Sequence, residues 1–188
     1  MTIPNILTLL RVAIIPIVVV LLIGGKSDAV RWWAFYLFVA SAVTDYFDGW
    51  LARMLNQESD FGRLFDPIAD KLLVAAVYFA LVDTGIIAGW NVLAVILIVS
   101  RELLVSALRE FLAGRGVTMP SSRQAKYKTT VQLVTAAALI VSPLFEPVIV
   151  QVALIGLWLA ATLTISSGYG YWMRAGEHIT ARADKAGE

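Results

Sequence analysis

Six long apolar stretches, separated by short polar breaks, run along the chain of 188 residues. A helix needs about 20 predominantly apolar residues to cross a bilayer, and most of the stretches reach that length alone. The pattern therefore predicts an all-α, polytopic membrane protein with six transmembrane helices. Arg11 interrupts the start of the first stretch, so residues 4–10 are predicted to form a short N-terminal interfacial helix. The stretches cover about residues 6–24, 31–52, 67–87, 90–113, 129–145 and 147–172.

The composition narrows the class of protein. Apolar residues make up 59% of the chain and charged residues only 15%, against roughly 25% charged residues in a typical soluble domain. Together with a mean hydropathy of +0.77, these values exclude a disordered chain and an ordinary soluble globule. We expect one membrane domain over residues 1–188. The net charge of +1 provides no strongly basic surface, so no nucleic-acid partner is expected.

Two rare residue types restrict the chemistry. The chain has no cysteine, which excludes disulfides, thiolate metal sites and a cysteine nucleophile. Its one histidine, His178, lies in the polar C-terminal tail. A metal ion would therefore have to be held by oxygen ligands.

The basic residues predict the orientation. Lys26 and Arg31 are the only basic residues in the first, third and fifth connections, whereas the connection from Gly114 to Lys128 carries four basic residues and no acid. Basic residues concentrate on the cytoplasmic side of membrane proteins. Six crossings then place both termini and the fourth connection in the cytoplasm.

Carboxylates occur where the second predicted span ends and the third begins. Asp45 and Asp48 are three residues apart, and Asp66 and Asp70 are four apart, so each pair shares a helix face. Only twelve residues separate Arg53 from Asp66, so the two faces are predicted to meet near the cytoplasmic surface. A charged group at the centre of a membrane helix costs about 2.5–3.5 kcal/mol on insertion scales, which makes these acids functional candidates.

Four carboxylates in one place repel one another unless protons or cations neutralise them. Oxygen-only ligands suit hard ions such as Mg²⁺ or Mn²⁺, and neighbouring carboxylates suit a pair of ions that bridge phosphate oxygens. Gly49 and Ala52, on the face of the first pair, leave room for a bulky ligand. The alternative is that the acids are helix caps and surface charges at a membrane boundary. Their number, on two consecutive helices with Arg53 beside them, favours the metal site.

These residues carry a family resemblance. Asp45, Asp48, Gly49, Ala52 and Arg53, followed by Gly62, Asp66 and Asp70, match all eight fixed positions of the CDP-alcohol phosphotransferase signature. The chain also resembles the bacterial phosphatidylglycerophosphate synthases of that family at four further motifs between residues 4 and 130. These are Pro4-Asn5-x-Leu7-Thr8-x-x-Arg11, Ser100-Arg101-Glu102, Ser106-Ala107-Leu108-Arg109-Glu110 and Lys126-Tyr127-Lys128-Thr129.

The resemblance implies a homodimeric, six-helix enzyme of the bacterial plasma (inner) membrane, in which an alcohol displaces CMP from a CDP-linked lipid. It assigns Asp45, Asp48 and Asp66 to two divalent cations, Mg²⁺ or Mn²⁺, and makes Asp70 a further ligand and the general base. It places the donor, CDP-diacylglycerol, against two groups of residues. Asn5, Thr8 and Arg11 hold its phosphates, and Asp45, Asp48, Gly49, Ala52, Arg53 and Gly62 line the cytidine and diphosphate pocket.

The acceptor is expected to be sn-glycerol 3-phosphate, which gives phosphatidylglycerophosphate and CMP in phospholipid biosynthesis. This dianion needs fixed cations near Asp70, for which Arg109 and Lys126 are the first candidates and Arg101 and Lys128 the second. Other interpretations exist for these residues. Arg101 could pair with Glu102 or with another helix, and the lysines could be anchors at lipid headgroups.

Other functions stay open at this point. The same chemistry with inositol phosphate, phosphatidylglycerol or serine as acceptor uses the same signature. An ion-coupled transporter also places acids in a membrane, but it predicts inverted halves, and the sequence has no such repeat. A structural scaffold leaves the acid cluster unexplained.

Overall fold

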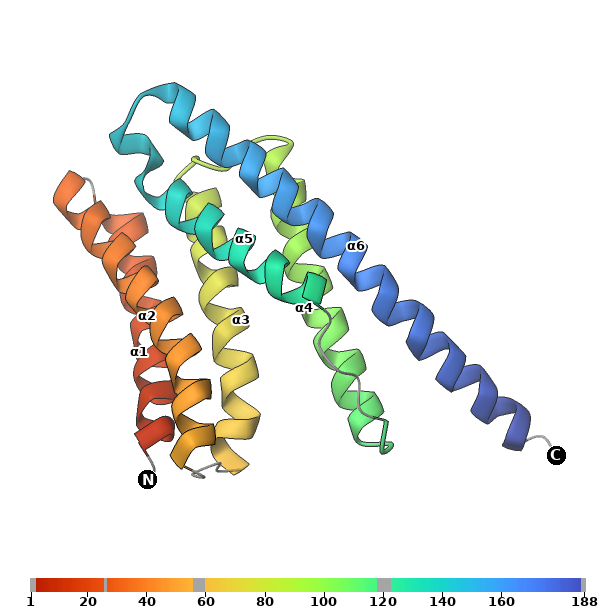
Figure 1. The fold of residues 1–188 in the computed structure, drawn as a ribbon. Helices are drawn as coiled ribbons and strands as arrows, with labels where there is room; N and C mark the ends of the chain where they lie inside the picture. Colours follow the sequence, from red (N-terminus) through yellow and green to blue (C-terminus); the bar gives the residue numbers. More distant parts are fainter. Residues whose placement is uncertain (1–2, 26, 56–59, 118–122, 187–188) are drawn as a thin grey trace.

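The computed structural model consists, in the part that it describes, of six α-helices and one 3₁₀ turn (Figure 1). It describes residues 3–25, 27–55, 60–117 and 123–186; the side chains of residues 3–8, 45–55, 60–67, 70, 123–126, 172 and 174–186 lie outside the described part. The elements are α1 (Ile3–Gly24), α2 (Asp28–Leu55), α3 (Asp60–Asp83), α4 (Asn91–Ala113), α5 (Arg123–Val141), η1 (Ser142–Leu144) and α6 (Pro147–Ala186). Each predicted apolar stretch falls largely on one of the α-helices, so the prediction of an all-α chain is confirmed.

Glycine and proline mark the turns between helices. After α3 the chain reverses through Gly85 and Gly89, whose φ angles of 75° and 60° are left-handed and therefore favour glycine. Between α5 and α6, Pro143 lies in the 3₁₀ turn and Pro147 is the first residue of α6. A proline there loses no helical hydrogen bond, because the first amides of a helix have no intrahelical partner.

The start and the end of the chain differ from the prediction. A separate interfacial helix over residues 4–10 is wrong, because α1 runs without interruption from Ile3 through Arg11 and Pro16 to Gly24. Pro4 lies in the first turn of α1, where proline is tolerated. The residues between Pro4 and Pro16 include no glycine that would favour a break in the helix. At the other end, α6 continues to Ala186, well past the apolar stretch that predicted it.

Helix α5 joins two groups of helices. Helix α1 contacts α2 and α3, α4 contacts α6, and α5 contacts α2, α3 and α6. Figure 1 shows the long α6 running alongside α5 and crossing α4, with α1–α3 grouped on the other side of α5. Fully buried side chains such as Phe38, Tyr78, Leu139 and Leu157 form one core between the two groups. In the same view α1 begins, α2 ends and α3 begins at one end of the bundle, which we call the signature end.

The surface is that of a membrane protein. Two helical segments, Asn91–Ala113 and Pro147–Tyr171, are long and apolar enough to cross a bilayer, and Leu9–Gly24 is a shorter apolar helix. Large apolar side chains also lie more than half exposed on each of the six α-helices that the structure describes. Such surfaces are rare on soluble monomers and mark contact with lipid or protein. Examples are Val20, Phe79, Leu103, Val134 and Ile155.

Candidate active site

The signature residues lie on the adjoining ends of two consecutive helices. Asp45 and Asp48 belong to the last three turns of α2, and Asp66 and Asp70 to the first three turns of α3. Both helices reach the signature end of the bundle (Figure 1). The side chains of these aspartates, and of Gly49, Ala52, Arg53 and Gly62 around them, lie outside the described residues. The helical placement is therefore confirmed, and the metal coordination stays a prediction.

The donor set of the signature fits a hard divalent cation. Its four acids offer only carboxylate oxygens, the ligands that Mg²⁺ and Mn²⁺ prefer. Among the side chains that the structure describes, no group of three or more acids or histidines converges elsewhere. The metal prediction consequently rests on Asp45, Asp48, Asp66 and Asp70.

The N-terminal motif lies on α1, which packs on both helices of the signature. Asn5 and Thr8 are in its first turns, and their side chains lie outside the described part. Arg11 follows one turn later and is only 3% exposed. Buried arginine is stable only with an anionic or polar partner. Arg11 has an interaction within the protein, and its role at the donor stays a prediction.

A second polar site lies within the bundle, where α4, α5 and α6 meet. Its centre is Glu102 on α4, whose Oε1 accepts hydrogen bonds from Arg101 Nη1 at 3.3 Å and Gln132 Nε2 at 3.4 Å. The same oxygen accepts from Nζ of Lys128, and the two form an ion pair. We call Arg101, Glu102, Lys128, Gln132, Thr164 and Ser167 the Glu102 cluster.

Gln132 links α5 to α6 within this cluster and also to α3. Its Nε2 donates to Thr164 Oγ1 on α6 at 2.8 Å, and its backbone carbonyl accepts from the Tyr78 hydroxyl of α3 at 3.0 Å. Gln132 is 3% exposed, and Thr164 and Tyr78 are fully buried. Because a buried polar group without a partner is costly, these bonds fix the register of α3, α5 and α6 against one another.

Arg101 is held by α6 as well as by Glu102. Its Nη2 donates to Ser167 Oγ at 3.0 Å, and its Cζ lies 5.8 Å from the centre of the Tyr171 ring. Each Nη carries two N–H groups, so the guanidinium keeps further donors beside these two bonds. Counting only the side chains that the structure describes, two cations of the cluster face one carboxylate, which leaves a net positive charge inside the bundle. Such a site favours an anionic ligand.

The four basic residues predicted to bind the acceptor do not all lie at one place in the structure. Arg101 and Lys128 meet at Glu102, so the alternative that Arg101 pairs with Glu102 and with another helix describes real contacts. Arg109 lies two turns farther along α4 and is exposed. The Lys126 side chain lies outside the described residues. The sequence interpretation named Glu102 only as a possible partner of Arg101, and it gave no role to Gln132, Thr164 or Ser167, although each is a polar residue inside an apolar stretch.

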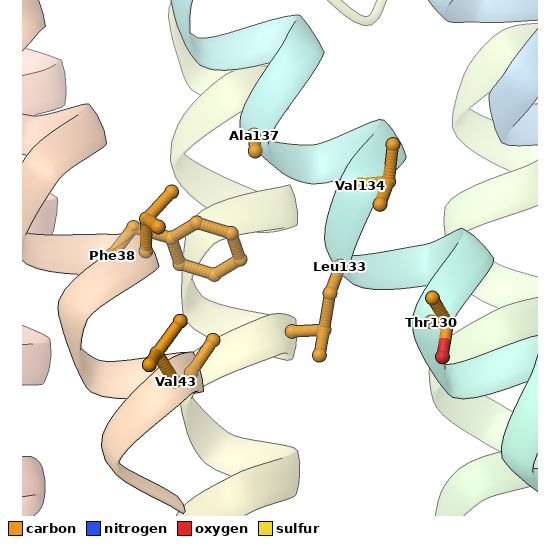
Figure 2. Close-up of a pocket in the computed structure, with 8 residues that line it drawn as sticks. Phe38, Val43, Thr130, Leu133, Val134 and Ala137 are labelled. Carbon is orange, nitrogen blue, oxygen red and sulfur yellow. The ribbon is translucent and has the colours of Figure 1, made fainter. Parts of the chain in front are cut away.

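An open apolar groove of about 400 Å³ lies between α2 and α5. Figure 2 shows Phe38 and Val43 of α2 on one side and Leu133 of α5 on the other. Ala42, which also lines the groove, stands three residues before Asp45 and therefore shares its face of α2. The groove thus lies about one helical turn from the start of the signature. Its lining residues are Phe38, Val39, Ala42, Val43, Thr130, Leu133, Val134 and Ala137.

Comparison with known proteins identifies the family. The family model for CDP-alcohol phosphatidyltransferase matches residues 1–166. A CDP-diacylglycerol--glycerol-3-phosphate 3-phosphatidyltransferase of Rickettsia typhi is 43% identical over 90% of this chain and 94% of its own length. The Bacillus subtilis protein of that name is 37% identical over 94% and 96% of the two chains. A probable phosphatidylglycerophosphate synthase of Mycobacterium tuberculosis is 40% identical over 91% and 80%. The chain is a member of the CDP-alcohol phosphatidyltransferase family.

Proposed function

We propose that the protein transfers the phosphatidyl group of CDP-diacylglycerol to sn-glycerol 3-phosphate, releasing phosphatidylglycerophosphate and CMP. The observation that carries the proposal is the name shared by relatives that align with about nine tenths of this chain. An apolar groove close to the signature and a net-positive cluster inside the bundle suit a lipid donor and an anionic acceptor. Inositol phosphate, phosphatidylglycerol and serine, the other acceptors that the signature allows, lack such specific support.

The direct test measures CMP release by the purified protein in detergent, with CDP-diacylglycerol, Mg²⁺ and one alcohol at a time. Glycerol 3-phosphate is expected to give by far the fastest release. A faster reaction with inositol phosphate, phosphatidylglycerol or serine would contradict the acceptor and leave the family chemistry intact. No CMP release with any alcohol would contradict the transferase itself and favour the transporter.

The donor's headgroup and acyl chains are assigned to different parts of the protein. Arg11 on α1, with Asn5 and Thr8, is proposed to contact the diphosphate, and the small residues of α2 leave space for the cytidine. One acyl chain would lie in the groove between α2 and α5, with its glycerol end toward Asp45. The groove is almost wholly apolar, as an acyl chain requires.

Filling the groove should weaken use of the donor selectively. Val134→Trp places a large ring there, whereas Val20→Trp adds the same ring to α1 at a position of similar exposure, 67% against 63%. We expect the KM for CDP-diacylglycerol to rise roughly two- to fivefold in Val134→Trp only. The effect is modest because the surrounding lipid is as apolar as the groove, so the groove mainly orients the chain. Equal donor KM values in the two variants would exclude this acyl-chain site.

The signature aspartates are proposed to hold two Mg²⁺ or Mn²⁺ ions, with Asp70 also serving as base. When bound, the ions would offset the charge of the diphosphate and of the departing CMP. Asp70 takes the proton of the acceptor hydroxyl, because an alcohol is a poor nucleophile near neutral pH. The acceptor oxygen then forms a bond to the phosphatidyl phosphorus, and the bond from that phosphorus to CMP breaks.

The acceptor phosphate is proposed to lie between the Glu102 cluster and the cytoplasmic end of α4. Arg101 and Lys128 supply fixed positive charge inside the bundle, where ion pairs with Glu102 hold both side chains. Arg109 and Lys126 supply the remaining contacts near the aqueous entrance. A dianion bound at this place compensates the excess positive charge of the cluster.

Arg109→Ala and Lys126→Ala should therefore raise the KM for glycerol 3-phosphate at least about tenfold, with little change in the donor KM. A charge-assisted hydrogen bond contributes about 1.5–3 kcal/mol, and each 1.4 kcal/mol is tenfold. Arg115→Ala is the matched control. It removes a cation that lies 3.9 Å from the Phe111 ring, outside the proposed site. A donor KM that rises as much as the acceptor KM would place Arg109 and Lys126 at the donor or at the membrane surface.

The finer topology is part of the proposal. We infer that all six α-helices cross the plasma membrane, with the signature end and both termini in the cytoplasm. This agrees with the basic fourth connection and with the exposed apolar side chains on several helices. The homodimer stays a prediction from the family resemblance.

A further inference from the structure

We propose that α6 positions Arg101 for the acceptor phosphate through a cradle formed by Ser167, Gly168 and Tyr171. The inference rests on the proposed function, because it takes Arg101 as a contact of the acceptor. It adds a role for a part of the chain that the match to the family, over residues 1–166, does not cover. The three residues act through Arg101 and are positioning residues.

The cradle contacts both the guanidinium and the stem of Arg101. Ser167 Oγ accepts from Nη2 at 3.0 Å, and the Tyr171 ring lies beside the guanidinium with 5.8 Å between Cζ and the ring centre. The stem passes Gly168 so closely that an added Cβ there would lie 3.1 Å from Nε and 3.2 Å from Cγ. Glycine at this position therefore admits the arginine stem between α4 and α6.

The contacts also determine which donors of Arg101 remain for a ligand. Nε is buried and makes no hydrogen bond in the part of the chain that the structure describes. Nη1 faces Glu102 and Nη2 faces Ser167. Each Nη carries a second N–H group, so both nitrogens can still donate to an oxygen of a phosphate. Fixing these donors before the acceptor binds removes the cost of ordering a long side chain.

Gly168→Ala tests the cradle with the smallest change. The added Cβ fits only if Nε and Cγ of Arg101 move away by a few tenths of an ångström. Neither atom is at a flexible end of the side chain, because Glu102 and Ser167 hold the guanidinium. The fold should persist, since alanine favours a helix over glycine. We expect the KM for glycerol 3-phosphate to rise about tenfold, as for a weakened charge-assisted hydrogen bond, while the donor KM and the Mg²⁺ requirement stay unchanged.

Two other glycines of α6 provide matched controls. A Cβ at Gly170 meets nothing within 4 Å, so Gly170→Ala changes only helix propensity. A Cβ at Gly156 would lie 3.0 Å from Thr135 Oγ1, so Gly156→Ala presses α6 against α5 away from Arg101. Neither variant should change the acceptor KM. An equal rise in Gly156→Ala would mean that general packing of α6 is responsible, and the cradle would be wrong.

A double-mutant cycle separates the cradle from the proposed function. In an Arg101→Ala background the added methyl of Gly168→Ala has no arginine to displace, so the acceptor KM should equal that of Arg101→Ala alone. Independent, multiplicative effects would overturn the cradle. If Arg101→Ala itself leaves the acceptor KM unchanged, the acceptor role of Arg101 fails. If Arg101→Ala raises that KM and Gly168→Ala does not, only the cradle fails.

Discussion

Asp48→Asn is expected to abolish nearly all CMP release while the protein still folds and inserts. The substitution keeps the shape of the side chain and removes its negative charge, and an amide is a poorer ligand than a carboxylate for Mg²⁺ or Mn²⁺. Asp48 lies near the end of α2 in the signature, where the proposed ions bind the diphosphate. Loss of one ligand should therefore remove the charge compensation on which the displacement depends.

The measurement is CMP release across a wide range of Mg²⁺ and Mn²⁺ concentrations. Asp83→Asn serves as the control, because it makes the same chemical change at an exposed position at the far end of α3. It should retain the activity of the unmodified protein. Substantial activity of Asp48→Asn at saturating Mg²⁺ would remove Asp48 from the metal site.

Asp70→Asn is expected to slow turnover by about 10²–10⁴-fold, the usual contribution of a positioned base, while Mn²⁺-dependent binding of CDP-diacylglycerol is nearly unchanged. A carboxylate accepts a proton only when ionised. For the unmodified enzyme, kcat/KM for glycerol 3-phosphate should therefore fall as the pH drops through the pKa of Asp70. The asparagine variant has no such group, so its pH–rate profile should lack this fall at acid pH, the acid limb.

Donor binding and a pH–rate profile, measured on the same two proteins, distinguish a base from a ligand. If Asp70→Asn no longer binds the donor with Mn²⁺, Asp70 is chiefly a metal ligand, and another group accepts the proton. If the acid limb persists in the variant, the titrating group is elsewhere. Either result would contradict the assignment of Asp70 as base.

The helices could be predicted because membrane spans depend on local composition. Continuous apolar stretches of about 20 residues predicted all six α-helices, but their ends were harder to place. Arg11 looked like an interruption in the sequence, whereas it is buried within a continuous α1. Hydropathy alone could not predict this, since it treats every arginine as a cost, whereas this side chain is buried and has an interaction within the protein.

In the candidate site, too, one part could be predicted from the sequence and another could not. Fixed spacing within two adjacent helices identified the four aspartates, because residues three or four apart share a helix face. The Glu102 cluster joins residues that are 26 to 66 positions apart in the sequence. Which polar side chains meet there depends on how α4, α5 and α6 cross, and no local pattern encodes this. Gln132 and Ser167 are uncharged, so a search for charges inside spans did not select them.

The Glu102 cluster also has a consequence for biogenesis. During synthesis α4 leaves the ribosome with Arg101 and Glu102 side by side, before Lys128 on α5 or Ser167 on α6 exists. The nascent span therefore enters the membrane with one mutually compensating pair, which lowers the cost of inserting two charges. The pair gains its third charge and its final hydroxyl partner only when the last two helices arrive. A chain that stops before α6 lacks the Ser167 hydroxyl, so it leaves a donor of Arg101 without this partner inside the membrane, which is costly.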